Sequence, residues 1–248
     1  MEILGALVAG AFIGSVLGFV GAGGAMLAVP ILIYGFGLAP SVASTAALAV
    51  VGAAALSGAS AKIKSKEIYY RDAFSIWAIG LVANIGFSTL VHRFSEDFIA
   101  IGFSFVIIFA GLSMLGSPLT NVHKRMSWPV LIGVSLLIGS ITGLFGIGGG
   151  FLVIPVLVLG FGTAQSIAAG TALLVIAMNS ATALLGHYVL WSEVTWKIPL
   201  LMGVSAIVIA QIASRIKLPI ADALLRKLFA YFLFAVAAFS LVERIFIV

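Results

Sequence analysis

The sequence predicts an all-α polytopic membrane protein that consists of two inverted repeats. Three features indicate this fold class: the composition, the spacing of the charged residues and an internal duplication. Hydrophobic residues make up 62% of the 248 residues and charged residues 8%, whereas soluble domains have roughly 45–50% and about 25%. So few charges cannot form a water-exposed surface. We therefore expect the lipid bilayer as a partner and no nucleic acid, despite the net charge of +5.

Uncharged stretches along the chain are long enough to cross a membrane. The two longest run over residues 3–61 and 126–192. Each has room for about three passes, because a spanning helix needs about 20 apolar residues. Shorter uncharged stretches supply one span each, over residues 73–92, 98–123, 198–214 and 228–242. Each repeat is thus expected to hold about four full spans.

Each long stretch is divided by a glycine cluster, Gly21–Gly24 or Gly146–Gly150. A short apolar segment follows each cluster, over residues 25–36 and 151–159. At 1.5 Å per residue such a segment reaches about 15–20 Å, while the hydrocarbon core is about 30 Å thick. The sequence therefore predicts a half-helix or re-entrant segment in each repeat.

The two glycine clusters belong to a duplicated sequence. Residues 13–48 align without a gap with residues 138–173, and 18 of the 36 aligned positions are identical. The identical positions include Pro30 and Pro155, which predict breaks in the two short helices. The duplication divides the chain into a first membrane repeat, 1–124, and a second, 125–248, joined by a linker over Ser117–Ser127.

The distribution of Lys and Arg favours inverted over parallel repeats. If each short segment turns back, ten of these residues lie on one face and three on the other. If it continues the preceding helix, the division is eight to five. Positive residues collect in cytoplasmic loops, so we expect a multi-pass protein of the cell (inner) membrane with both termini on the non-cytoplasmic side. The smaller set of the ten-to-three division is Arg93, Lys197 and Arg244; the larger is Lys62, Lys64, Lys66, Arg71, Lys124, Arg125, Arg215, Lys217, Arg226 and Lys227.

The glycine clusters are the candidate substrate site. Irregular backbone at membrane depth persists only where it is buried in protein or lines a polar cavity, and paired interrupted segments in two halves are typical of transporter sites. Free N–H groups at a helix start bind anions, and glycine lets the backbone approach the ligand. The predicted substrate-binding residues are Gly21, Gly23, Gly24, Ser44, Thr45, Gly146, Gly148, Gly149, Gly150, Thr171 and Asn179, with Ser180 near them.

Other polar or small residues are expected to hold helices together. Asn84 and Gln211 lie inside apolar spans, where amides usually bond neighbouring helices and less often contact ligand. Two stripes of small residues repeat every fourth position and predict close helix packing; they are Gly10, Gly14 and Gly18, and Ser135, Gly139 and Gly143.

The sequence predicts no enzyme, metal or cofactor. The chain has no cysteine, which excludes thiolate metal sites and a cysteine nucleophile. No nucleophile elbow, dinucleotide fingerprint or phosphate loop is complete. His92, His123 and His187 lie near predicted span ends, where we expect contact with lipid headgroups rather than with a metal.

The duplicated motif resembles the TauE/SafE family of membrane permeases. The resemblance rests on Gly18-x-x-Gly21-x-Gly23-Gly24 with Pro30, and on Gly143-x-x-Gly146-x-Gly148-Gly149-Gly150 with Pro155. It covers nearly the whole chain and implies secondary transport of small sulfur-containing anions such as sulfite, a sulfonate or thiosulfate. Coupling to a proton or another ion is implied too. An anion channel with the same site is the alternative, and the oligomeric state is left open.

Overall fold

The computed structural model describes residues 2–115, 127–216 and 222–246, and this part of the chain is helical without a strand. The predicted all-α polytopic class is confirmed. Within these residues, six helices are long and apolar enough to cross a membrane. They cover Glu2–Val20, Pro40–Lys64, Tyr70–Arg93, Glu96–Ser113, Trp128–Phe145 and Gln165–Gly186. The linker predicted at Ser117–Ser127 lies outside the described residues apart from its last residue.

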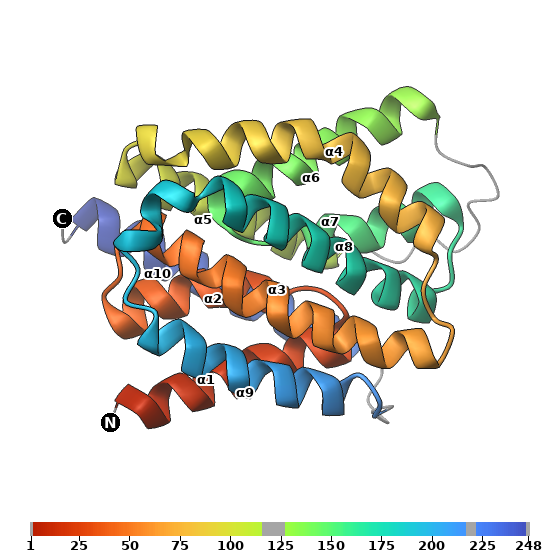
Figure 1. Ribbon diagram of the computed structural model, residues 1–248, viewed down its shortest axis with the longest axis horizontal. Coiled ribbons are helices and arrows are strands. Elements are labelled where there is room, and N and C mark those ends of the chain that lie inside the picture. The colour runs from red at the N-terminus through yellow and green to blue at the C-terminus, as the bar shows by residue number, and fades with distance from the viewer. Residues whose placement is uncertain (1, 116–126, 217–221, 247–248) are drawn as a thin grey trace.

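The two repeats contain the same series of helices (Figure 1). The first repeat comprises α1 (Glu2–Val20), α2 (Gly24–Pro30), η1 (Ile31–Gly35), α3 (Pro40–Lys64), α4 (Tyr70–Leu90), η2 (Val91–Arg93) and α5 (Glu96–Leu115). The second comprises α6 (Trp128–Phe145), α7 (Gly150–Pro155), η3 (Val156–Gly160), α8 (Gln165–Gly186), η4 (Tyr188–Ser192), α9 (Lys197–Ala213) and α10 (Asp222–Phe246). Helix α9, with 17 residues, is apolar but slightly shorter than the six long spans.

The short segments of both repeats are helices, and in each the α-helix ends at its proline while the chain continues as a π-helix. Pro30 keeps helical angles (φ −64°, ψ −34°), and the chain continues from it as the five-residue π-helix η1. Pro155 leads into η3 in the same way. Proline lacks an N–H and so removes an α-helical hydrogen bond. The backbone changes from α to π pairing beyond each proline instead of breaking.

Equivalent helices of the two repeats run in opposite directions. Successive residues along α3 contact residues in and just after α8 in the reverse order: Thr45 contacts His187, Gly52 contacts Ser180, and Gly58 contacts Leu173. Since α3 and α8 are the same element of the duplication, their antiparallel course is what inverted repeats require. In Figure 1 both described chain ends lie at the same end of the bundle.

The repeats also exchange packing partners. Helix α1 packs along α9, and its counterpart α6 packs along α4. The predicted stripes of small residues form these contacts: a Cβ on Gly14 would lie 2.5 Å from the carbonyl oxygen of Ala206, and one on Gly143 would lie 2.7 Å from that of Asn84. The packing role predicted for both stripes is confirmed. Helices α3 and α8 are the most buried spans, while α4 is mostly exposed on the outside of the bundle.

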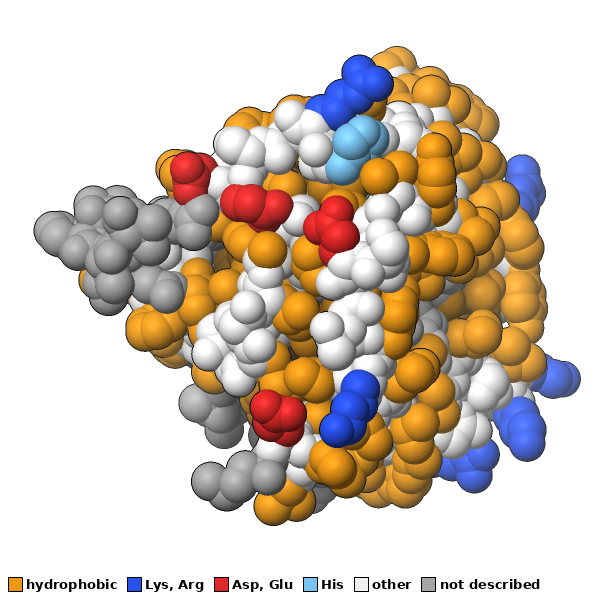
Figure 2. Space-filling view, turned by 60° about the vertical axis from the view of Figure 1, so that its left-hand side comes forward, with side chains coloured by type: hydrophobic (Ala, Val, Ile, Leu, Met, Phe, Trp, Pro, Cys, Tyr) orange, Lys and Arg blue, Asp and Glu red, His pale blue; other side chains and the backbone are white. Residues whose placement is uncertain are grey.

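Charged side chains lie at the two ends of the bundle. The starts of α1, α5 and α9 lie at one end and carry Glu2, Glu96, Asp97 and Lys197. The opposite end carries the last turn of α3 with Lys62 and Lys64. Figure 2, in which the first end is turned toward the viewer, shows acidic side chains grouped there and Lys and Arg side chains along the far edge. Apolar side chains cover the surface between the ends.

Candidate functional site

The two glycine breaks lie side by side in the centre of the bundle. Every residue of 21–24 and 146–150 is buried. A Cβ built on Gly150 would lie 3.5 Å from the Cβ of Ala22, so the break of one repeat contacts the break of the other. The start of α2 and the start of α7 are therefore neighbours, although about 125 residues separate them in the sequence.

Left-handed backbone explains why these positions are glycines. Gly146 ends α6 with φ 69°, and Gly148 and Gly149 follow with φ 71° and 69°. Residues with a Cβ rarely adopt such angles. In the first repeat Gly21 and Gly23 have φ 73° and 94°. The chain thus turns sharply between each full span and the short helix that follows it.

Each break packs against the start of the central helix from the other repeat. A Cβ on Gly21 would lie 2.5 Å from the Cβ of Ala169 on α8, and one on Gly146 would overlap the carbonyl oxygen of Ser44 on α3. Ser44 is fully buried, and its hydroxyl donates to the carbonyl oxygen of Pro40 at 2.9 Å. Of the predicted hydroxyl residues, Ser44 therefore lies directly beside a break.

A group of buried polar side chains adjoins the second break. On α8, Ser180 is fully buried, and its hydroxyl lies 3.3 Å from the position of a Cβ on Gly148. The preceding residue, Asn179, accepts at its backbone and side-chain oxygens from the amide nitrogen of Asn84, at 3.0 and 3.3 Å. Among the described residues, neither the Ser180 hydroxyl nor the Asn84 side-chain oxygen has a hydrogen-bond partner.

Two other predicted polar residues bond to a loop and to a neighbouring helix. Thr171 accepts a hydrogen bond from the backbone N–H of Tyr69, in the loop before α4, at 3.0 Å. The amide of Gln211 on α9 bonds the hydroxyls of Ser57 and Ser60 on α3, at 3.2 and 3.0 Å. Gln211 therefore links two helices, as amides inside spans usually do.

The position of His187 differs from the sequence-based expectation. It directly follows α8 and is 1% exposed, so the predicted contact with lipid headgroups is wrong for this residue. Its ring is bonded on both sides, to the Thr45 hydroxyl at 2.8 Å and to the carbonyl oxygen of Gly143 at 2.7 Å. The end of α8 is covered by α3 and α6, which the sequence position alone could not indicate. His92 is exposed, as predicted, and His123 lies outside the described residues.

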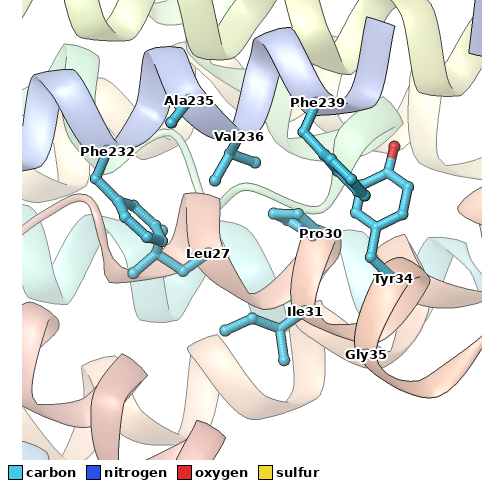
Figure 3. Close-up of a pocket in the computed structure, with 9 residues that line it drawn as sticks. All are labelled: Leu27, Pro30, Ile31, Tyr34, Gly35, Phe232, Ala235, Val236 and Phe239. Carbon is cyan, nitrogen blue, oxygen red and sulfur yellow. The ribbon is translucent and has the colours of Figure 1, made fainter. Parts of the chain in front are cut away.

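An apolar pocket of about 470 Å³ lies between the first short helix and α10 (Figure 3). Leu27, Pro30 and Ile31 line it on one side, with Phe232 and Val236 on the other. Its lining offers an anion little more than carbon, so it is not the predicted anion site. The described residues also contain no group of three His, Asp or Glu side chains that could hold a metal ion.

The fold and its paired breaks define a multi-pass membrane protein with the architecture of a transporter. Residues 6–240 match the family model described as "Sulfite exporter TauE/SafE". The chain belongs to the TauE/SafE family.

Curated relatives carry the name "Probable membrane transporter protein". One from Xylella fastidiosa (strain 9a5c) is 30% identical over 156 residues, which cover 60% of each chain. Another from Methanocaldococcus jannaschii, MJ0441, is 34% identical over 117 residues, 45% of this chain and 43% of the relative. The chain thus spans about half the length of these two relatives. A third, from Xylella fastidiosa (strain Temecula1), is 26% identical over 93% of this chain and 91% of its own length. The family and these names indicate a membrane transporter rather than an enzyme.

Proposed function

We propose that this protein is a secondary transporter of small anions, in which the substrate binds between the two glycine breaks and reaches the two membrane faces alternately. The observation that carries the proposal is the buried Ser180 hydroxyl beside the second break, which has no partner among the described residues. A buried polar atom without a partner costs about 1–3 kcal/mol. A substrate whose oxygens accept from the Ser180 hydroxyl would remove this cost.

The charge distribution favours an anion held by uncharged donors. No Lys or Arg occurs in residues 3–61 or 126–192, which include both breaks. Each short helix instead begins at a break: Met26 and Leu152 donate to the carbonyl oxygens of Gly23 and Gly149, and the N–H groups before them belong to a helix start, which attracts negative charge. The burial of both breaks lowers the local dielectric constant and strengthens these interactions.

The family supports a sulfur-containing substrate. Its model is described as a sulfite exporter, and sulfite, sulfonates and thiosulfate carry their charge on several oxygens. Such oxygens accept hydrogen bonds from N–H and hydroxyl groups at the same time. We therefore propose sulfite, a sulfonate, thiosulfate or a related organic anion as substrate.

Replacement of Ser180 tests the site. Ser180→Ala removes a hydroxyl that has no partner among the described residues, so the fold should be unaffected while the substrate loses a donor. We expect the concentration for half-maximal counterflow in proteoliposomes to rise about tenfold or more, since a hydrogen bond to a charged group contributes about 1.5–3 kcal/mol. Ser135→Ala is the matched control, because that hydroxyl is also buried and unpartnered but lies on α6 at the contact with α4. Unchanged counterflow in both variants would remove Ser180 from the site.

The same proteoliposomes separate a transporter from a channel. Substrate on the far side should accelerate uptake of labelled anion, because a carrier must bring its site back across the membrane. Conductance that follows the electrical potential alone, with no counterflow, would establish an anion channel instead.

A thermal-shift series with sulfite, thiosulfate, taurine, sulfoacetate and carboxylates identifies the ligand, because bound ligand stabilises the folded state. Stabilisation by cations only would contradict an anion site.

A further inference from the structure

His187 connects three helices of the bundle at the end where the chain termini lie. Its side chain, 1% exposed, lies against α3 through Thr45 and against α6 through Gly143. Gly143 is three residues before Gly146, where α6 ends and the second break begins. The imidazole therefore contacts the span that leads directly into the proposed substrate site.

The two hydrogen bonds determine which ring nitrogen carries a proton. The carbonyl oxygen of Gly143 can only accept, so Nε2 of His187 must be the donor in the 2.7 Å bond. The Thr45 hydroxyl, 2.8 Å from Nδ1, can accept or donate. It also lies 2.9 Å from the carbonyl oxygen of Ser41, which offers its hydrogen a second acceptor.

Both charge states of His187 are therefore satisfied by the same neighbours. In the neutral ring, the Thr45 hydroxyl donates to Nδ1. In the charged ring, Nδ1–H donates to the hydroxyl oxygen, and the hydroxyl hydrogen turns to the carbonyl oxygen of Ser41. A carbonyl or an amide N–H at Nδ1 would instead fit one charge state alone.

The network reaches the surface at a carboxylate. Glu96, at the start of α5 and only partly buried, accepts from the backbone N–H of Ser41 at 2.8 Å and from its hydroxyl. This is the charged group of the network. Among the described residues, the groups shown against this region from the other elements are uncharged: Thr45 on α3, the Gly143 carbonyl on α6, and on α4 Ser88, which faces Gly186. The following segment, η4, carries Tyr188, whose side chain is exposed.

We propose that His187 is the proton-binding residue that couples transport to a proton gradient. This rests on the transport function proposed above and specifies its coupling ion and the residue that binds it. Nδ1 takes a proton from hydronium at the end of the molecule that carries Glu96, so that one N–H bond forms and one O–H bond of hydronium breaks. The proton returns from Nδ1 to water at the opposite face after the central helices rearrange.

Proton uptake is linked to the opening of this end. Where the ring is buried as here, desolvation lowers the pKa of His187 to about 4, so the ring is neutral at physiological pH. Water that enters between α3, α6 and α8 stabilises the charged ring, because desolvation is what disfavours it. The charged ring then bonds Thr45 and Gly143 more strongly than the neutral ring does. The protonation state of His187 thus affects α3 and α6, the two spans that its ring contacts.

His187→Gln tests this assignment, since a glutamine amide can donate to Gly143 and accept from Thr45 but cannot bind a proton at neutral pH. In proteoliposomes we expect anion counterflow without a pH gradient to persist. We expect accumulation driven by a pH gradient to be lost, and the dependence of uptake on pH to disappear. His92→Gln changes an exposed histidine at the same end. It should keep the gradient-driven accumulation and the pH dependence of the wild type.

The outcomes separate this inference from the transport function. Absence of anion counterflow in the wild type would contradict the proposed function itself. Counterflow together with undiminished gradient-driven accumulation in His187→Gln would overturn the role of His187 while leaving the transporter intact. Loss of both activities in His187→Gln, with insertion and folding preserved, would also overturn it, since the residue would then be required for binding or movement rather than for the proton.

Discussion

At the scale of single residues, neighbours rather than residue types decide the roles of the polar side chains. Ser135 and Ser180 are both buried serines without a partner among the described residues, but only Ser180 lies beside a glycine break. His92 and His187 both follow long helices, yet one is exposed and the other is bonded on both ring nitrogens. The functional assignments therefore depend on contacts that cross between the two repeats.

The pH dependence of stability should report the burial of His187. Burial lowers its pKa from 6.5 to about 4 in the folded protein, and the bond to Gly143 raises it in part. The unfolded chain therefore binds this proton more readily, and the stability that the neutral ring contributes is fully present above about pH 6.5 and is lost as the pH falls toward 4. We expect the melting temperature in detergent to fall further between about pH 7.5 and about pH 4.5 in the wild type than in His187→Gln.

The remaining titratable groups are the same in all three proteins, so the comparison between variants carries the result. His92→Gln should follow the wild type, because that side chain is exposed in the folded protein. Three identical pH profiles would show that His187 has the same proton affinity in the folded and unfolded states, contrary to its burial.

At the scale of elements, helices approach closely where small residues replace larger ones. Gly139 on α6 faces the backbone of α4, and a Cβ there would overlap the carbonyl oxygen of Gly80. Backbone atoms cannot move aside as a flexible side chain can. The helix pairs α1–α9 and α6–α4 use the same arrangement, which holds each repeat to the other. In a lipid environment such packing replaces the hydrophobic effect as the main force between helices.

Two glycines of α6 provide a matched test of this packing. Gly139→Ala should lower the free energy of unfolding by about 1–3 kcal/mol, as overpacking does. Gly133→Ala, on the same helix, meets no atom within 4 Å and should be neutral or stabilising by about 0.5–1 kcal/mol, since alanine is the better helix former. The measurement is the melting temperature of each purified variant in detergent. Equal effects of the two changes would mean that the contact with α4 is not close.

At the scale of the whole molecule, the described charges are distributed as the inverted arrangement requires. Arg93 and Lys197 lie at the end that carries the helix starts of α1 and α5, while Lys62, Lys64 and Arg215 lie at the other. Parallel repeats would have grouped Lys197 with Lys62. The positive-inside rule assigns the Lys-rich end to the cytoplasm, and we propose this orientation, with both termini on the opposite side.

The absence of native cysteine makes the orientation directly measurable. Ser65→Cys places a thiol in the exposed loop after α3, at the Lys-rich end, and Ser95→Cys places one in the exposed loop before α5, at the other end. In intact cells a membrane-impermeant maleimide should label the variant at position 95 and spare the variant at position 65. Labelling of position 65 alone would reverse the proposed orientation. Labelling of both in intact cells would contradict loops on opposite sides.

The sequence alone determined the membrane class, the duplication and the two short helices. These features depend on composition and on local order: long uncharged stretches need lipid, and consecutive glycines weaken a helix. The small-residue stripes could also be assigned to packing from the sequence, because a periodicity of four places their residues on one helix face. The π-helices after Pro30 and Pro155 could not be predicted, since a missing N–H permits either a break or a change of pairing.

Only the tertiary structure decided which polar residues gather at the breaks. Asn84 and Asn179 are brought together by contact between α4 and α8, and Thr45 meets His187 because α3 and α8 run antiparallel. Thr171 and Gln211 had the same sequence signal but bond to a loop and to a neighbouring helix. A side chain's partners depend on how helices distant in sequence cross. Periodicity predicts the face on which a residue lies, but not which helix covers that face.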